Sequence, residues 1–206
     1  YKVDANGTIL YWDSKEYPLM IFGAHNLQNL IGAMRLGETI GISPDVFLTQ
    51  MATFKGAGKR LQKVIESDKF TMFKDFAHSP SKLKATTAAV KHQYPNRKVV
   101  ACMELHTFSS LKKEFLPHYE GAMIAADEAL VYFNPEVVHH KKLEAISIKQ
   151  VSDGFGGGVE VKNETADVLS FIRSHSWNNA VLLMMSSGNF DGIDYDQLGE
   201  ELCATL

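Results

Sequence analysis

The sequence predicts an α/β protein with a mainly parallel, Rossmann-like sheet. Short apolar runs alternate with segments of helical periodicity, and polar turns separate them. Strands are expected at 70–73, 99–103, 130–133, 146–148 and 181–185, with a further one near 159–161. Helices are expected at 80–93, 110–125, 141–144, 165–174 and 195–203. This alternation favours parallel strands with helices packed on both faces of the sheet.

The first 68 residues follow a different pattern, so we divide the chain into a segment at 1–68 and a main domain at 69–206. The segment predicts a hairpin that turns at Asn6-Gly7, then a strand at 19–22. Two helices follow, from Asn26 to Gly37 and from Ser43 onward, the second with Val46, Phe47 and Met51 facing inward. So small a sheet cannot bury both helices. We therefore expect the end of a larger domain whose beginning is missing.

Bulk composition excludes several classes of function. The net charge of −3 over 206 residues is unsuited to nucleic-acid binding. No run approaches the roughly 18 apolar residues of a membrane span, and no signal peptide is apparent. Cys102 and Cys203 stand in apolar contexts without metal-ligand spacing. Reduced thiols and a cytoplasmic location are therefore expected.

The turn at 75–80 attracts attention because it joins a strand to a helix. Ser79 can cap that helix and Pro80 suits its first position. Such a turn lies at the carboxyl end of a strand, where ligands bind in α/β sheets. It places Asp75 and His78 at that edge. On chemistry alone, an ordinary capped helix explains the pattern equally well.

Asp-Phe-Ala-His-Ser-Pro at 75–80 resembles the Asp-Tyr-Ala-His-Thr/Ser-Pro signature of the Mur ligase superfamily, the ATP-dependent amide-forming ligases of peptidoglycan and folylpolyglutamate synthesis. Two further matches stand upstream in the right order, Gly-Ala-His-Asn-Leu-Gln-Asn at 23–29 and Thr-Phe-Lys-Gly-Ala-Gly-Lys-Arg-Leu-Gln at 53–62. The segment 185–193 is similar to the Met-Ser-x-Gly-x-Phe-x-Gly-Ile ending of the murein peptide ligases, one branch of this superfamily. Three ordered motifs are far more specific than any one of them.

The resemblance implies ATP as cofactor, with Mg²⁺ ligands mostly in the missing upstream region, because the chain lacks a phosphate-binding loop. It implies cofactor-binding roles for Asn29 at the adenine, Asn26 in the turn beside it, Arg60 at the phosphates and Asp75 at the ribose. It also implies that His25 shapes the first motif on the substrate side. The alternative for His25 and Asn26 is that they merely cap a helix.

The acceptor pocket implied by the resemblance consists of His78, His106, Ser187, Gly188 and Asn189, and Arg60 and His78 are the implied catalytic residues. The alanine-adding branch has two arginines where this chain has Thr107 and Ser110. Phe76 stands in place of the commoner tyrosine. The loss of the two arginines suggests a different acceptor, or a different way of holding it, whereas Phe76 removes a hydroxyl and any hydrogen bond that it would make.

The reaction implied is the joining of UDP-N-acetylmuramate to L-Ala-γ-D-Glu-meso-diaminopimelate through an acyl phosphate, as in peptidoglycan recycling. This segment alone is expected to be inactive without its missing N-terminal and central domains. Three alternatives stay open: a UDP-N-acetylmuramate–L-alanine ligase, a folylpolyglutamate synthase relative and a non-catalytic nucleotide-binding module.

The remaining motifs have simpler interpretations. The glycine-rich stretch at 154–158 is expected to be a flexible loop, since it does not match a dinucleotide-binding fingerprint. His92, His118 and His175 are expected to face solvent. His139 and His140 are expected to be surface residues without a metal.

Overall fold

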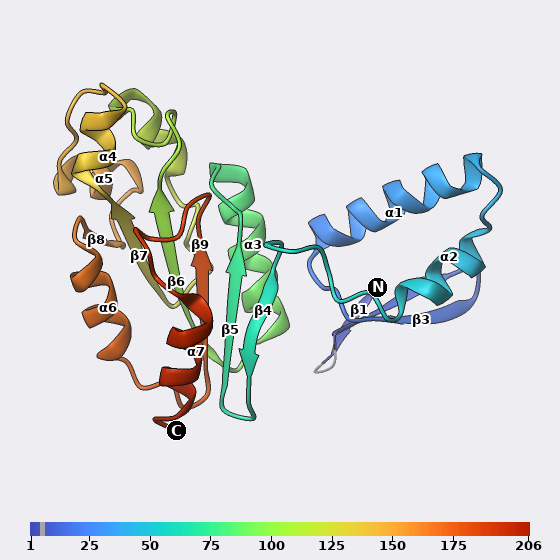
Figure 1. The fold of residues 1–206 in the computed structure, drawn as a ribbon. Coiled ribbons are helices and arrows are strands. Elements are labelled where there is room, and N and C mark those ends of the chain that lie inside the picture. Colours follow the sequence, from blue (N-terminus) through green and yellow to red (C-terminus); the bar gives the residue numbers. More distant parts are fainter. Residues whose placement is uncertain (5–6) are drawn as a thin grey trace.

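The computed structural model describes residues 1–4 and 7–206. It has two parts, a small one at the N-terminus and a larger one built on a six-stranded sheet (Figure 1). The sheet has the order β4-β5-β9-β6-β7-β8. Its strands are β4 (Gln62–Glu66), β5 (Phe70–Asp75), β6 (Lys98–Leu105), β7 (Glu128–Phe133), β8 (Glu160–Lys162) and β9 (Ala180–Met185). Only β4, at one edge, pairs antiparallel, so the mainly parallel α/β prediction is confirmed.

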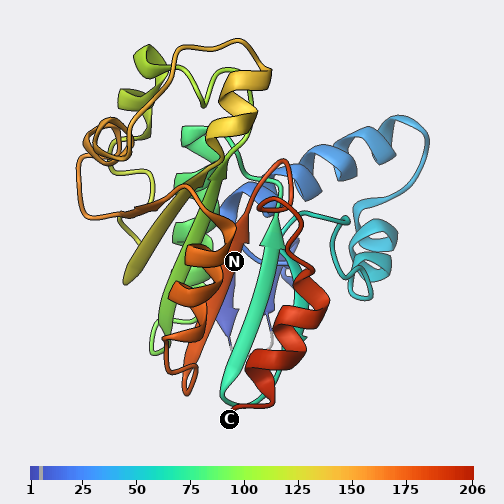
Figure 2. The ribbon, with the colours of Figure 1, turned by 60° about the vertical axis from the view of Figure 1, so that its left-hand side comes forward.

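Helices cover both faces of this sheet (Figure 2). One face packs against α3 (Pro80–Gln93), α4 (Pro135–His140) and α5 (Ile148–Gly154), and the other packs against α6 (Thr165–Arg173) and α7 (Tyr195–Cys203). The central strands β5, β6 and β9 are buried on both faces, which explains their nearly continuous apolar sequence. The predictions at 80–93 and 195–203 match α3 and α7 to the residue.

Three of the predicted elements in this part are wrong. Residues 146–148 form no strand, because Ser147 and Gln150 make a capping box that starts α5. Residues 110–125 form turns and a short 3₁₀ helix, η1 (Lys113–Tyr119), which contains Pro117 and so cannot sustain an α-helix. The helix expected at 141–144 lies earlier, in α4, where Asn134 caps the first turn.

The N-terminal part contains the sheet β1-β2-β3 (Lys2–Asp4, Gly7–Trp12 and Lys15–Leu19) and the helices α1 (Ala24–Thr39) and α2 (Pro44–Met51). The hairpin pairing of β1 with β2 is confirmed, whereas the predicted turn residue Asn6 lies outside the described residues. The predicted strand at 19–22 is wrong. Asp13 and Ser14 adopt positive φ in a tight turn, so the strand that pairs with β2 ends at Leu19.

The second helix begins after Ser43, as predicted, but Val46 faces outward and is 54% exposed. Leu48 takes the inward position instead and packs in the small core with Leu27 and Met34 of α1. Within the described residues no helix is long and apolar enough to cross a membrane.

The two parts touch through a few apolar contacts in addition to the covalent connection. The Phe22 ring lies edge-on to Phe73 of β5, with 5.6 Å between ring centroids. Gly23 follows with φ of +90°, and a Cβ there would lie 2.8 Å from the Ala89 side chain of α3. Glycine thus permits close approach of α1 to α3. The predicted division at residue 68 stays a prediction, although β4 lies before it and belongs to the larger sheet.

The glycine-rich turn, the two cysteines and four of the histidines were also predicted from the sequence. Gly156, Gly157 and Gly158 all have positive φ and turn the chain after α5. Cys102 and Cys203 are free thiols, as expected. His92, His118, His139 and His140 are exposed.

The prediction that His175 faces solvent is wrong. Its side chain is only 9% exposed, and its Nδ1 lies 2.7 Å from the Phe171 carbonyl oxygen. Its Nε2 faces a carboxylate oxygen of Glu128, whose other oxygen pairs with Lys98. The hydrogen bond with Lys98, and second that with His175, lower the pKa of Glu128 below its ordinary value.

A lowered pKa in the folded state means that the ionised Glu128 stabilises the fold above its ordinary pKa and ceases to do so as the pH falls through the folded value. We expect Glu128→Gln to lower the unfolding free energy at pH 7 by no more than about 1 kcal/mol, since the pair is partly exposed. Urea unfolding at pH 7 and pH 3 tests this. A variant that is equally destabilised at both values would contradict it.

Candidate functional site

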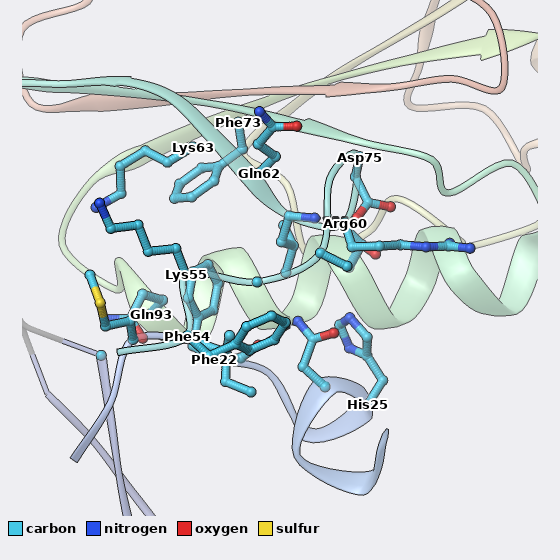
Figure 3. Close-up of a pocket in the computed structure, with 18 of the residues that line it drawn as sticks. Phe22, His25, Phe54, Lys55, Arg60, Gln62, Lys63, Phe73, Asp75 and Gln93 are labelled. Atoms are coloured by element: carbon cyan, nitrogen blue, oxygen red, sulfur yellow. Dashed lines mark hydrogen bonds between the residues drawn. The ribbon is translucent and has the colours of Figure 1, made fainter. Parts of the chain in front are cut away.

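Five of the predicted residues line one cavity between the two parts of the chain. This cavity, of about 1870 Å³, is bounded by the start of α1, the segment 54–63, the end of β5 and α3. Its wall includes the four predicted cofactor residues, Asn26, Asn29, Arg60 and Asp75, and also His25. Figure 3 shows Arg60 and Asp75 across from His25. Residues from three separate motifs thus come together.

Asp75 ends β5, and its carboxylate is 7% exposed. One oxygen accepts from the Leu61 backbone N–H and the other from the Ala77 N–H, both at 2.6 Å. The carboxylate therefore ties the segment before β4 to the turn after β5. Each oxygen keeps a further lone pair, so the group can still accept from two ligand hydroxyls.

The segment before β4 is held in an unusual backbone conformation. Lys59 and Leu61 have φ of +56° and +42°. The Phe76 N–H donates to the Lys59 carbonyl at 2.9 Å, which adds a second tie beside that of Asp75. These bonds present Arg60 at the cavity, with its guanidinium 5.4 Å from the centre of the Phe76 ring. Phe76 thus supports Arg60 through its ring face.

His25 and Asn26 lie in the first turn of α1, which has Gly23 as N-cap and no side-chain capping bond. They do not cap the helix, contrary to the alternative interpretation. The Asn26 amide donates to the Phe22 carbonyl at 2.9 Å, and Asn29 is exposed one turn later. Burial lowers the pKa of His25, and this effect outweighs the opposing charge of Asp75. His25 is therefore neutral at pH 7 and can donate and accept one hydrogen bond each.

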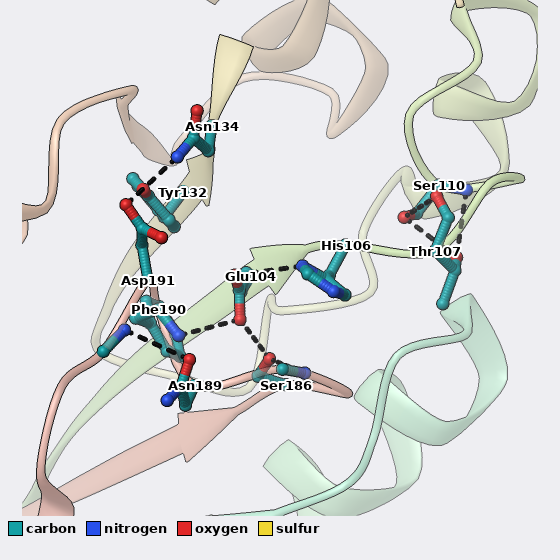
Figure 4. Close-up of polar contacts among 12 residues, drawn as sticks. Glu104, His106, Thr107, Ser110, Tyr132, Asn134, Ser186, Asn189, Phe190 and Asp191 are labelled. Carbon is teal, nitrogen blue, oxygen red and sulfur yellow. Dashed lines mark hydrogen bonds and ion pairs between the residues drawn. The ribbon is translucent and has the colours of Figure 1, made fainter. Parts of the chain in front are cut away.

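Four of the five predicted acceptor residues, His106, Ser187, Gly188 and Asn189, lie elsewhere, at the carboxyl ends of β6 and β9. Figure 4 shows this group, which centres on a residue that the sequence interpretation missed, Glu104. Its carboxylate is buried and accepts from the Ser186 hydroxyl and, at 2.9 Å, from the Phe190 N–H. His106 Nδ1 lies 3.4 Å from its other oxygen.

The remaining predicted acceptor residues lie in the loops after β9 and β5. The Ser187 hydroxyl is buried and has no hydrogen-bond partner within the described structure. Asn189 accepts from the Gly192 N–H at 3.1 Å and is exposed. His78 follows β5, where its Nδ1 lies 2.9 Å from the Phe76 carbonyl oxygen. Its own carbonyl oxygen accepts from the Tyr119 hydroxyl at 2.6 Å.

Thr107 and Ser110, which stand in place of two arginines of the alanine-adding branch, bond to one another. The two hydroxyl oxygens are 2.9 Å apart, and the Ser110 N–H also donates to the Thr107 hydroxyl. They form a local turn after β6 and carry no charge. The ammonium of Lys141 lies 4.4 Å from the centre of the neighbouring Phe108 ring.

Sequence reasoning missed Glu104 and the backbone ties of Asp75 for different reasons. Glu104 and His106 are two residues apart at the end of a strand, a spacing that places both side chains on one side. That signal was available in the sequence. The partner of Asp75 is a backbone N–H of Leu61, and no side-chain pattern encodes it.

The cavity residues fit a nucleotide. Asn amides offer donors and an acceptor to a purine edge, a guanidinium suits phosphate oxygens, and the free lone pairs of Asp75 suit ribose hydroxyls. For a metal ion, the described residues contain no group of three or more His, Cys, Asp or Glu side chains that could hold it. We therefore assign no step to magnesium in this chain.

No protein-family model matches the sequence. The chain is similar to a UDP-N-acetylmuramate–L-alanine ligase of Agathobacter rectalis, with 28% identity over 183 residues that cover 87% of this chain and 39% of the relative. A second such ligase, from Chlorobium phaeobacteroides, is 34% identical over 121 residues, or 57% of this chain and 26% of the relative. The chain thus spans about two fifths or less of these relatives.

Two solved structures share the fold. The UDP-N-acetylmuramate-alanine ligase MurC of Thermotoga maritima superposes with a TM-score of 0.69 and 18% identity, over 93% of this chain and 40% of that one. A murein peptide ligase of Psychrobacter arcticus gives 0.60 and 20% identity, over 88% and 37%. The six-stranded sheet with its helices thus has the fold of the Mur ligase C-terminal domain, and the sequence relatives are named as ligases of this type.

Proposed function

We propose that this chain is part of an ATP-dependent, amide-forming Mur-type ligase that acts on UDP-N-acetylmuramate. The observation that carries the proposal is the meeting of three sequence motifs, through Asn26, Arg60 and Asp75, on the wall of one cavity. A bound nucleotide could contact all three, because the Asn26 amide suits a base, the Arg60 guanidinium suits a phosphate and the Asp75 carboxylate suits a ribose.

In this reaction ATP, as co-substrate, phosphorylates the lactyl carboxylate of the UDP-sugar. Arg60 would bind phosphate oxygens through its guanidinium, whose charge is permanent and whose fork can contact two of them. Asp75 would orient the ribose. These residues position charge and reactants, which is the main contribution of a protein to phosphoryl transfer.

For the acceptor, we propose the peptide L-Ala-γ-D-Glu-meso-diaminopimelate. The support is the resemblance of 185–193 to the murein peptide ligases and the uncharged Thr107–Ser110 turn, which has no arginine to hold a single amino acid by its carboxylate. L-Alanine is the second candidate, because the sequence relatives are named as L-alanine ligases.

The deciding experiment uses a full-length protein that contains this chain, with ATP, Mg²⁺ and UDP-N-acetylmuramate. Phosphate release is followed with the tripeptide or with L-alanine as acceptor. We expect release with the tripeptide and at most slow release with L-alanine. Release with L-alanine alone would replace the acceptor assignment, and no release with either would overturn the ligase proposal.

Asp75 should contribute both to folding and to nucleotide binding. Asp75→Ala leaves the N–H groups of Leu61 and Ala77 without an acceptor, so we expect the unfolding free energy to fall by about 2–4 kcal/mol. Asp75→Asn keeps one carbonyl oxygen and should lose less. Urea unfolding of this chain measures the first effect, and the KM for ATP of the full-length protein measures the second. An unchanged KM in a folded Asp75→Asn variant would exclude the ribose role.

The stacking of Arg60 on Phe76 should affect ATP affinity more weakly than Arg60 itself does. Phe76→Ala removes the ring under the guanidinium, and we expect the KM for ATP to rise about two- to five-fold, the equivalent of about 0.5–1 kcal/mol. Phe76→Tyr keeps the ring and serves as the matched control. Arg60→Lys loses the fork and should raise KM at least about tenfold. Equal effects of the alanine and tyrosine variants would argue against a stacking role.

A further inference from the structure

Glu104 is a buried carboxylate that, among the described residues, has no Lys or Arg partner and faces a histidine. Its side chain is 3% exposed, and the partner His106 is 38% exposed. Burying a charge is costly unless hydrogen bonds and an opposite charge compensate for it. The group therefore needs an explanation beyond packing.

The hydrogen bonds around Glu104 fix the role of each of its oxygens. The Gly188 N–H donates to the Ser186 Oγ at 2.6 Å, so the Ser186 hydroxyl is free to donate to Glu104 Oε2. The Phe190 N–H donates to the same oxygen at 2.9 Å. Oε2 is thus an acceptor of two bonds, and Oε1 is the oxygen that faces His106 Nδ1 at 3.4 Å.

The turn after β9 leaves room for this pair only because residue 188 is glycine. A Cβ at Gly188 would lie 2.9 Å from Glu104 Oε2 and 3.2 Å from His106 Nδ1. A side chain at that position would push the imidazole away from the carboxylate. The sequence of the turn is therefore matched to the contact between Glu104 and His106.

We propose that Glu104 is a positioning residue that holds His106 in the tautomer protonated at Nδ1, so that His106 Nε2 acts as the base for a primary-amine acceptor. This inference rests on the proposed ligase function. A carboxylate that faces one ring nitrogen makes that nitrogen the donor and leaves the other as acceptor. The 3.4 Å separation suits a contact that tightens when substrate orders the loop.

The chemistry balances without another reactant. The neutral amine of the acceptor attacks the carbonyl carbon of the acyl phosphate, and a C–N bond forms. His106 Nε2 takes the proton that the nitrogen loses. The tetrahedral intermediate then collapses, the bond between carbon and the phosphate oxygen breaks, and the departing phosphate receives the proton from His106. The products are the amide and inorganic phosphate.

Other groups near Glu104 are poorly suited to be this base. Burial, with the charge of Glu104 as a lesser cause, raises the pKa of the Tyr195 phenol. Burial also raises the pKa of the Tyr132 phenol, and the negative charges of Asp191 and Glu104 raise it further. Both phenols stay protonated at neutral pH. Asp191 accepts from the Asn134 amide at 3.1 Å, on the far side of the Phe190 turn.

The first test measures the tautomer of His106 in this chain by long-range ¹H–¹⁵N spectra at pH 8, with the signals assigned through His106→Gln. We expect a proton on Nδ1 in the unchanged chain. In Glu104→Gln the amide nitrogen can face Nδ1 as a donor, so the proton should move to Nε2. Glu128→Gln is the matched control, because it alters the other Glu–His pair and should change the His175 signals alone. If His106 has the same tautomer in the unchanged chain and in Glu104→Gln, the proposal is wrong.

The second test uses the full-length protein and the better acceptor. Glu104→Gln and His106→Gln should each lower kcat about 100-fold with unchanged KM for ATP, and the double variant should be no slower than His106→Gln alone. Additive losses would mean that Glu104 does not act through His106. If Glu104→Gln fails to fold, His106→Gln still decides, since an unchanged kcat would exclude the base. Absence of all ligase activity in the unchanged protein would refute the proposed function, whereas the spectra test the pair itself.

Discussion

The carboxylate of Asp75 joins the parts of this molecule that have to act together. It lies at the end of a buried strand, which fixes its position, and its two oxygens hold the backbone of Leu61 and Ala77. One of these bonds secures the segment that leads from the N-terminal part into the sheet, and the other secures the turn into α3. The position of Arg60, one residue before Leu61, depends on the first bond.

Glu104 is a second buried carboxylate at a strand end, on β6, which lies on the other side of β9 from β5. Both carboxylates stand at the carboxyl ends of parallel strands. Asp75 accepts from two backbone N–H groups, and Glu104 accepts from the Phe190 N–H and the Ser186 hydroxyl. Buried carboxylates of this kind fix loops more rigidly than apolar contacts do, because a lost partner leaves a charge or an N–H unpaired. The bonds of Asp75 and Glu104 therefore fix the neighbouring loops relative to the sheet. Several of the side chains proposed to bind the nucleotide and the acceptor belong to these loops.

The sequence predicted the regular parts of the fold and failed where local chemistry competes with periodicity. The helix at 80–93 follows from Pro80 at its first position and from apolar spacing, and that at 195–203 begins after the capping side chain of Asp194. The helix expected at 110–125 failed because Pro117 breaks the hydrogen-bond pattern, and the strand at 146–148 failed because Ser147 is a better helix cap than a strand residue. For the candidate site, motif order placed five residues that line one cavity. It could not reveal contacts made through the backbone, and the sequence interpretation overlooked the strand-end pair of Glu104 and His106.

The cavity is lined by residues from both parts of the chain, so the affinity of a ligand depends on how the two parts face each other. His25, Asn26 and Asn29 come from α1, whereas Arg60 and Asp75 belong to the sheet and the segment before it. The parts meet through Phe22 against Phe73 and through the close approach at Gly23. A ligand that contacts both sides stabilises the arrangement in which they face each other, and its affinity depends on how often that arrangement is populated. Nucleotide affinity is therefore expected to respond to changes in the backbone ties at Lys59 and Leu61 as strongly as to changes in the side chains that touch the nucleotide.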